Sequence, residues 1–146
     1  MIFRAVCVTL AVAFGATAVL AQSAAIADRK AIMKGVGGAA KTGAGFAKGS
    51  TPYDNAKAVE VFVIYANAAG KMPGLFPDDS KSGGETTAAP KIWSDKAAFT
   101  AAFAKFEADS KAAQASVKDL DSFKGAFGGL TKNCGGCHET YRVKKS

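Results

Sequence analysis

Apolar and small residues recur every three or four positions along most of the chain, and no stretch alternates apolar and polar residues for long. This spacing predicts helices throughout. Turn signals divide the pattern into segments, and Asp119 or Asp121 can cap the last of them. Four amphipathic helices are therefore expected, over residues 23–47, 52–69, 91–117 and from the Asp119 or Asp121 cap to about residue 141.

Each predicted helix has one apolar face. The expected core positions are Ile26, Met33, Val36, Ala40 and Ala47; Val59, Phe62, Val63 and Ala66; Trp93, Phe99, Phe103 and Phe106; and Phe123, Phe127, Leu130, Cys134, His138 and Tyr141. Thr51 and Pro52 are suited to start the second helix, and prolines and glycines mark residues 70–90 as the one long loop. Short links between amphipathic helices predict an all-α, antiparallel four-helix bundle with no second domain.

The first residues have a different composition. MIFRAVCVTLAVAFGATAVLA combines Arg4, an apolar run over residues 5–20 and small residues near its end. This is the pattern of a secretory signal peptide, residues 1–21, cleaved after about Ala21. The run is short for a membrane span and no stop-transfer charges follow it. We therefore expect a periplasmic domain over residues 22–146, from which Cys7 has been removed.

The formal charge of the chain is +7. Export argues against a nucleic-acid partner, and the lysines are scattered along the sequence instead of clustered. Most of them are expected to solvate the helix surfaces. The basic balance also favours partner proteins with acidic surfaces and predicts no stable membrane insertion.

The chemistry is concentrated at the C-terminal end, where Cys134-Gly-Gly-Cys137-His138 holds the only histidine of the chain. This C-x-x-C-H pattern is typical of covalent attachment of haem c. On a helix, residues three and four apart share a face, so both thiols lie beside the imidazole. Cys134 and Cys137 would then form thioethers with the porphyrin, and His138 would bind the iron as a metal ligand.

Other interpretations of the motif are weaker. A structural zinc site needs four ligands, and the chain after the signal peptide offers at most three from its cysteines and histidine. A thioredoxin-like pair needs a βαβ unit, which the sequence does not predict. A Cys134–Cys137 disulfide closes so short a loop that it would stabilise little. A chance motif with a buried structural histidine is the remaining alternative.

The order of several segments resembles the class II cytochromes c, the cytochrome c′ family. They are DRKAIMKG, TPYDNAK, KMPGLFPDDSK, PKIWSDKAAF and CGGCHETYRVKK. The resemblance covers essentially all of the chain after the signal peptide, and only the last segment is specific by itself. It implies a four-helix bundle with one covalent haem c near the C-terminal end of the last helix.

The family divides by the residue on the far side of the haem, where its pattern is Arg-x-x-x-ligand. Here Arg29 leads to Met33, so the resemblance implies Met33 as a second metal ligand, as in the low-spin methionine and histidine branch. From the residues alone, a gap-filling core methionine is the favoured interpretation of Met33. The resemblance also places Arg29 and Arg142 near the haem propionates, as cofactor-binding residues or ordinary surface arginines. Five phenylalanines, Phe99, Phe103, Phe106, Phe123 and Phe127, are expected to form the wall around the haem.

These expectations describe a periplasmic monohaem electron carrier with axial His138 and Met33, active as a monomer or homodimer. It would not be an enzyme, because the only histidine is engaged by iron and no carboxylate pair or nucleophile stands out. The first alternative is a five-coordinate cytochrome c′ type protein that binds small gases such as NO or CO. The second is a helical protein without haem, with a Cys134–Cys137 disulfide.

Overall fold

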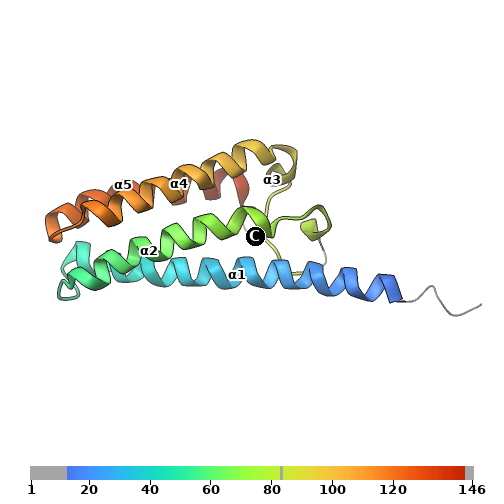
Figure 1. The fold of residues 1–146 in the computed structure, drawn as a ribbon, viewed down its shortest axis with the longest axis horizontal. Coiled ribbons are helices and arrows are strands. Elements are labelled where there is room, and N and C mark those ends of the chain that lie inside the picture. Colours follow the sequence, from blue (N-terminus) through green and yellow to red (C-terminus); the bar gives the residue numbers. More distant parts are fainter. Residues whose placement is uncertain (1–12, 83, 144–146) are drawn as a thin grey trace, which may run out of the picture.

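The computed structural model of the chain describes residues 13–82 and 84–143. Its elements are α1 (Ala13–Lys48), α2 (Asn55–Lys71), the 3-10 turns η1 (Met72–Leu75) and η2 (Asp78–Lys81), α3 (Lys91–Ser94), α4 (Lys96–Ser116) and α5 (Leu120–Tyr141). In Figure 1, α1 and α2 lie side by side below α4 and α5. The expected all-α four-helix bundle is confirmed, with α3 as a short addition.

Helix ends follow local capping chemistry. α1 ends before Gly49, whose φ of 70° is a left-handed conformation that glycine adopts without strain. The side chain of Asp54 accepts a hydrogen bond from the Lys57 N–H at 3.0 Å, so α2 starts at Asn55 and the expected start at Pro52 was wrong. Asp119 caps α5 as expected.

The expected third helix is interrupted. At Asp95 the backbone has φ −139° and ψ 51°, which separates α3 from α4. Ile92, before the break, and Phe99, after it, are buried in the same apolar cluster. The indole N–H of Trp93 donates to the Pro77 carbonyl at 3.1 Å, so α3 is attached to the long loop.

The N-terminal segment is only partly described. Residues 1–12 of the predicted signal peptide lie outside the described residues, while residues 13–21 continue α1 towards the N-terminus. In Figure 1 these first turns extend past the rest of the bundle. Within residues 13–82 and 84–143, none of the helices is long and apolar enough to cross a membrane.

The interior consists of two apolar clusters. The first surrounds Phe46, Phe62, Tyr65 and Phe123, near the turn between α1 and α2. The second contains Met72, Phe76, Phe99 and Phe103, beneath the long loop. On α2 the buried face is rotated from the expected one, since Val61 and Tyr65 are buried while Val59 and Val63 are only partly so.

Gly43 permits a close approach between α1 and α5. A Cβ atom built there would lie 2.8 Å from Cζ of Phe127 and closer still to its Cε2. A side chain at this position would displace a buried ring. By contrast, a Cβ at Gly128, on the exposed side of α5, would meet nothing within 4 Å.

These surroundings give opposite expectations for two Gly→Ala substitutions. Gly43→Ala should lower the free energy of unfolding by about 1–3 kcal/mol, because the core is overpacked. Gly128→Ala should raise it by about 0.5–1 kcal/mol, because alanine favours helix. Denaturant unfolding of the two holoproteins checks both, and a stable Gly43→Ala protein would show that α1 and α5 do not meet there.

Candidate functional site

A cavity of about 940 Å³ opens beside the second apolar cluster. It is lined by α1, α4 and α5, by Met72 and Phe76, and by residues 85–88 of the long loop. This volume is at the upper end of the range for small-molecule and cofactor sites, about 300–1,000 Å³. The cavity is therefore large enough for a cofactor much bigger than a metal ion.

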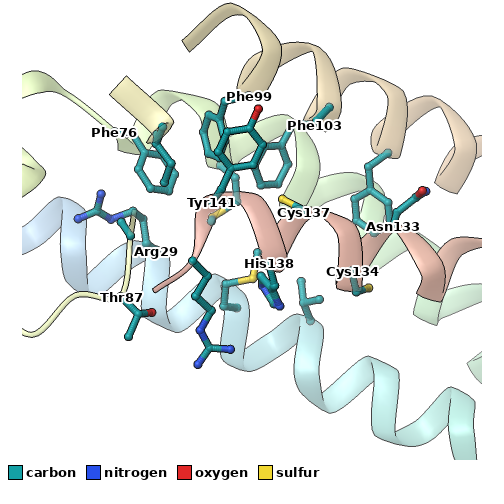
Figure 2. A pocket seen from close by; sticks show the side chains of 18 of the residues that line it. Arg29, Phe76, Thr87, Phe99, Phe103, Asn133, Cys134, Cys137, His138 and Tyr141 are labelled. Carbon is teal, nitrogen blue, oxygen red and sulfur yellow. The ribbon is translucent and has the colours of Figure 1, made fainter. Parts of the chain in front are cut away.

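One wall belongs to α5. Cys134, Cys137 and His138 all line the cavity, as their spacing of three and four residues predicts (Figure 2). The two cysteines are half-buried and free, and burial raises the pKa of both thiols. His138 was expected among the core positions, but it lines the cavity as an exposed residue. Partial desolvation by its neighbours, and then the positive charge of Arg142, lower the pKa of His138. A lowered pKa favours the neutral imidazole, which is the form that binds metals.

Met33 lines the same cavity from α1. It is half-buried and packs against the second apolar cluster. Met72 was expected to lie in the loop, but it is buried at 4% exposure and lines the cavity as well. The cavity thus contains two thioether side chains, and the sequence pattern pointed to only one of them.

Arg29 is engaged by the long loop. It is buried, and its guanidinium donates to the Ser80 carbonyl at 3.1 Å and to the Ser80 hydroxyl at 3.4 Å. It also lies 4.5 Å from the centre of the Phe76 ring, a cation–π arrangement. Burial lowers its pKa. Arg29 also lines the cavity. Its expected role beside the cofactor therefore stays a prediction, while its contact with the loop is what the structure shows.

The C-terminal end of α5 is tied to the same loop. The Ala89 N–H donates to the Tyr141 carbonyl at 3.0 Å, and the Val143 N–H donates to the Thr87 carbonyl at 2.9 Å. This short antiparallel pairing, with a bridge between Ala88 and Arg142, places Thr87 and Arg142 at the cavity. Sequence reasoning missed it, although the β-branched pair Thr86-Thr87 was a weak signal for extended backbone.

The expected phenylalanine wall is only partly correct. Phe99, Phe103 and Phe106 line the cavity, whereas Phe123 and Phe127 belong to the first apolar cluster. Tyr141, whose place the sequence left open, packs edge-on against Phe99 with ring centres 5.1 Å apart and lines the cavity (Figure 2). Asn133, not singled out from the sequence, also lines it.

The donor set fits a covalent haem. Two thiols and an imidazole share one face of α5, and two thioethers and several aromatic rings line the same cavity. The guanidinium groups at the edge of the cavity can pair with the carboxylates of a haem. Among the described residues, no cluster of His, Cys, Asp and Glu side chains could hold a bare metal ion.

Comparison with known proteins agrees with this fit. Residues 24–142 match the protein family described as cytochrome C′. The chain belongs to the cytochrome c′ family. It is 45% identical over 135 residues to a cytochrome c′ of Rhodopseudomonas palustris, covering 92% of each chain, and 33% identical over 146 residues to a cytochrome c-556 of the same organism, covering 97% and 98%.

A solved structure of cytochrome c′ from Rhodopseudomonas palustris superposes with a TM-score of 0.80 at 47% identity, covering 84% of this chain and 98% of that one. The fold and the overall class, a c-type cytochrome, are therefore established. The expected cofactor, one covalently bound haem c with its iron, is confirmed at the level of the family.

The contacts of Arg29 predict its effect on stability. Arg29→Met keeps an apolar stem but leaves the Ser80 carbonyl without its donor, so the free energy of unfolding should fall by about 1–3 kcal/mol. Arg142→Met, at an exposed arginine on the same cavity, should change it by less than about 0.5 kcal/mol. Urea unfolding of the holoproteins measures both, and proteolysis of residues 72–90 should speed up for Arg29→Met alone. Equal stability of the two variants would contradict the contact.

Proposed function

We propose that this protein is a periplasmic monohaem electron carrier in which Cys134 and Cys137 hold the haem covalently and His138 and Met33 bind its iron. One observation carries the proposal: the two thiols and imidazole of α5 and the Met33 thioether of α1 line the same cavity. The haem supplies one-electron chemistry when bound. The protein's part is to attach, orient and shield it.

The residues divide that work. The lowered pKa of His138 favours the neutral ring, whose nitrogen can bind iron without first losing a proton. Met33 offers a soft sulfur ligand, which favours the ferrous state and so raises the reduction potential. Phe99 and Phe103 keep water from the interior of the site, and Arg142, at its edge, can pair with a haem carboxylate.

The proposed location follows from the N-terminal segment. Its composition is that of a cleaved signal peptide, and the family match begins at residue 24, just after the proposed cleavage near Ala21. We infer that residues 22–146 form the exported domain. We assign no catalysis to it, since the one imidazole is engaged as a ligand.

A second function has its own support. The relative with 45% identity is a cytochrome c′, whereas the cytochrome c-556 is 33% identical. In a cytochrome c′ type protein the iron is five-coordinate and open to small gases such as NO or CO, and Met33 would only fill space in the core. Its burial against the second apolar cluster is compatible with that role as well.

Two methionine variants separate the functions. In the electron carrier, the ferric spectrum of the wild type is low-spin with a sulfur-to-iron band, and Met33→Leu abolishes this band and makes the iron high-spin. Met72→Leu, a matched change on the same cavity, should leave both features intact. A wild type that is already high-spin and binds CO freely would establish the gas-binding alternative. Loss of the band in Met72→Leu alone would assign the ligand to Met72.

Covalent attachment has a separate test. Replacing Cys134 and Cys137 together with serine should remove the haem stain that the wild type retains on a denaturing gel, while Met72→Leu keeps it. Because the haem would occupy the cavity between α1, α4 and α5, the unloaded double variant should unfold without cooperativity. A variant that kept the stain would rule out thioether attachment at these cysteines.

A further inference from the structure

Basic side chains surround the mouth of the cavity. Exposed cations come from three helices, namely Lys30, Lys34, Lys105, Lys132 and Arg142, and are called here the basic rim. Among the described residues that line the cavity, Glu85 is the one carboxylate. No pattern in the sequence indicates this grouping, because the five positions are spread over more than a hundred residues.

Much of this charge is not neutralised locally. Lys30 lies 3.9 Å from Glu85, and Lys105 lies 2.6 Å from Asp109. In residues 13–82 and 84–143, Lys34, Lys132 and Arg142 have no ion-pair partner. Outside the cavity lining, Lys111 pairs with Glu107 on α4, and Lys91 pairs with Asp95 just after α3. Exposed lysines such as Lys57 and Lys124 have no ion-pair partner among the described residues either, so what distinguishes the basic rim is its grouping around one opening.

The arrangement is slightly unfavourable for the isolated protein. Lys30 and Lys34 are four residues apart on α1, where like charges repel. Unpaired cations around an apolar opening also concentrate positive potential there. Such a potential steers an approaching anionic surface towards the mouth. Folding does not require these cations to lie together, so binding of an anionic surface would explain why they do.

An apolar residue adjoins the basic rim. Val143 follows Arg142 and is 45% exposed, and it is the large hydrophobic residue that stands out to solvent in the described part of the chain. Brief electron-transfer complexes combine a small contact area with charged surroundings. Val143, next to Arg142 in the chain, offers an apolar contact, and the basic rim offers the charged ones.

We propose that the basic rim is the docking surface for a redox protein whose own centre lies beneath an acidic surface. The proposal rests on the electron-carrier function above and adds where, and to what kind of surface, the protein docks. In the encounter the partner gains one electron as the haem iron passes from ferrous to ferric, or the reverse. No bond forms or breaks.

Stopped-flow oxidation of the ferrous holoprotein by an acidic blue-copper protein tests this. The rim variant Lys34→Glu with Lys132→Glu is compared with Lys57→Glu with Lys124→Glu, which changes the net charge equally at exposed positions outside the cavity lining. At low salt the rim variant should react about tenfold or more slowly than the wild type, and the control within about twofold. The wild-type rate should fall as salt is added. Unchanged visible spectra verify that both variants are folded.

Several results would overturn the proposal. Equal slowing in both variants would mean that only net charge matters, and a salt-independent wild-type rate would remove charge steering. Binding of the holoprotein to vesicles of anionic phospholipid at physiological salt, lost in the rim variant alone, would assign the basic rim to a membrane surface instead. Anionic hexacyanoferrate(III) separates the two proposals. If hexacyanoferrate(III) oxidises the protein rapidly and the rim variant reacts with the blue-copper protein as fast as the wild type, the docking surface alone is ruled out. If every reagent oxidises the protein slowly, the electron-carrier function is ruled out, and the docking surface with it.

Discussion

The structure depends on holding α1 and α5 together at Gly43 while leaving a cavity between them farther along. They touch where Gly43 admits the Phe127 ring, and beyond that contact both line the cavity. At its start α5 is fixed by the Asp119 cap, and at its end by the pairing of Thr87 with Val143. A helix held at both ends and in the middle can present two thiols and an imidazole to an open space without collapsing into it.

The long loop supplies the remaining wall, and Arg29 fixes it. Burying a guanidinium is unfavourable unless its donors are satisfied. Here the Ser80 carbonyl and hydroxyl accept from it, and Phe76 stacks beneath it. In the Arg-x-x-x-ligand pattern that pointed to Met33, Arg29 is therefore the residue that orders the loop. It lies one turn before Met33, the proposed ligand, on the same helix. Stability of the loop and geometry of the site are coupled through α1.

Sequence reasoning found what depends on local spacing. The periodicity gave four helices, the Asp119 cap was correct, and Cys134, Cys137 and His138 share a face because helical geometry requires it. What it missed depends on tertiary contacts. The break at Asp95, the burial of Met72 and the pairing of residues 87 and 143 involve segments that meet only after folding. Periodicity shows which residues share an apolar face but not whether that face borders a cavity. Phe123 and Phe127 were therefore expected at the haem, whereas they belong to the first apolar cluster.

The two candidate functions require the same cavity. They differ in the role of one side chain, since Met33 binds the iron in the electron carrier and only fills space in the gas-binding protein. Every contact that orders the site, from the Asp119 cap to the Arg29–Ser80 hydrogen bonds, would serve a five-coordinate haem as well as a six-coordinate one. The fold can therefore be shared by relatives with either name, as the similarity to both a cytochrome c′ and a cytochrome c-556 illustrates. The charge around the mouth does not depend on whether Met33 binds the iron, but it bears on the choice between the two functions. A gas reaches iron without regard to surface lysines, whereas a protein partner must approach through them, so a function for the basic rim favours electron transfer over gas binding.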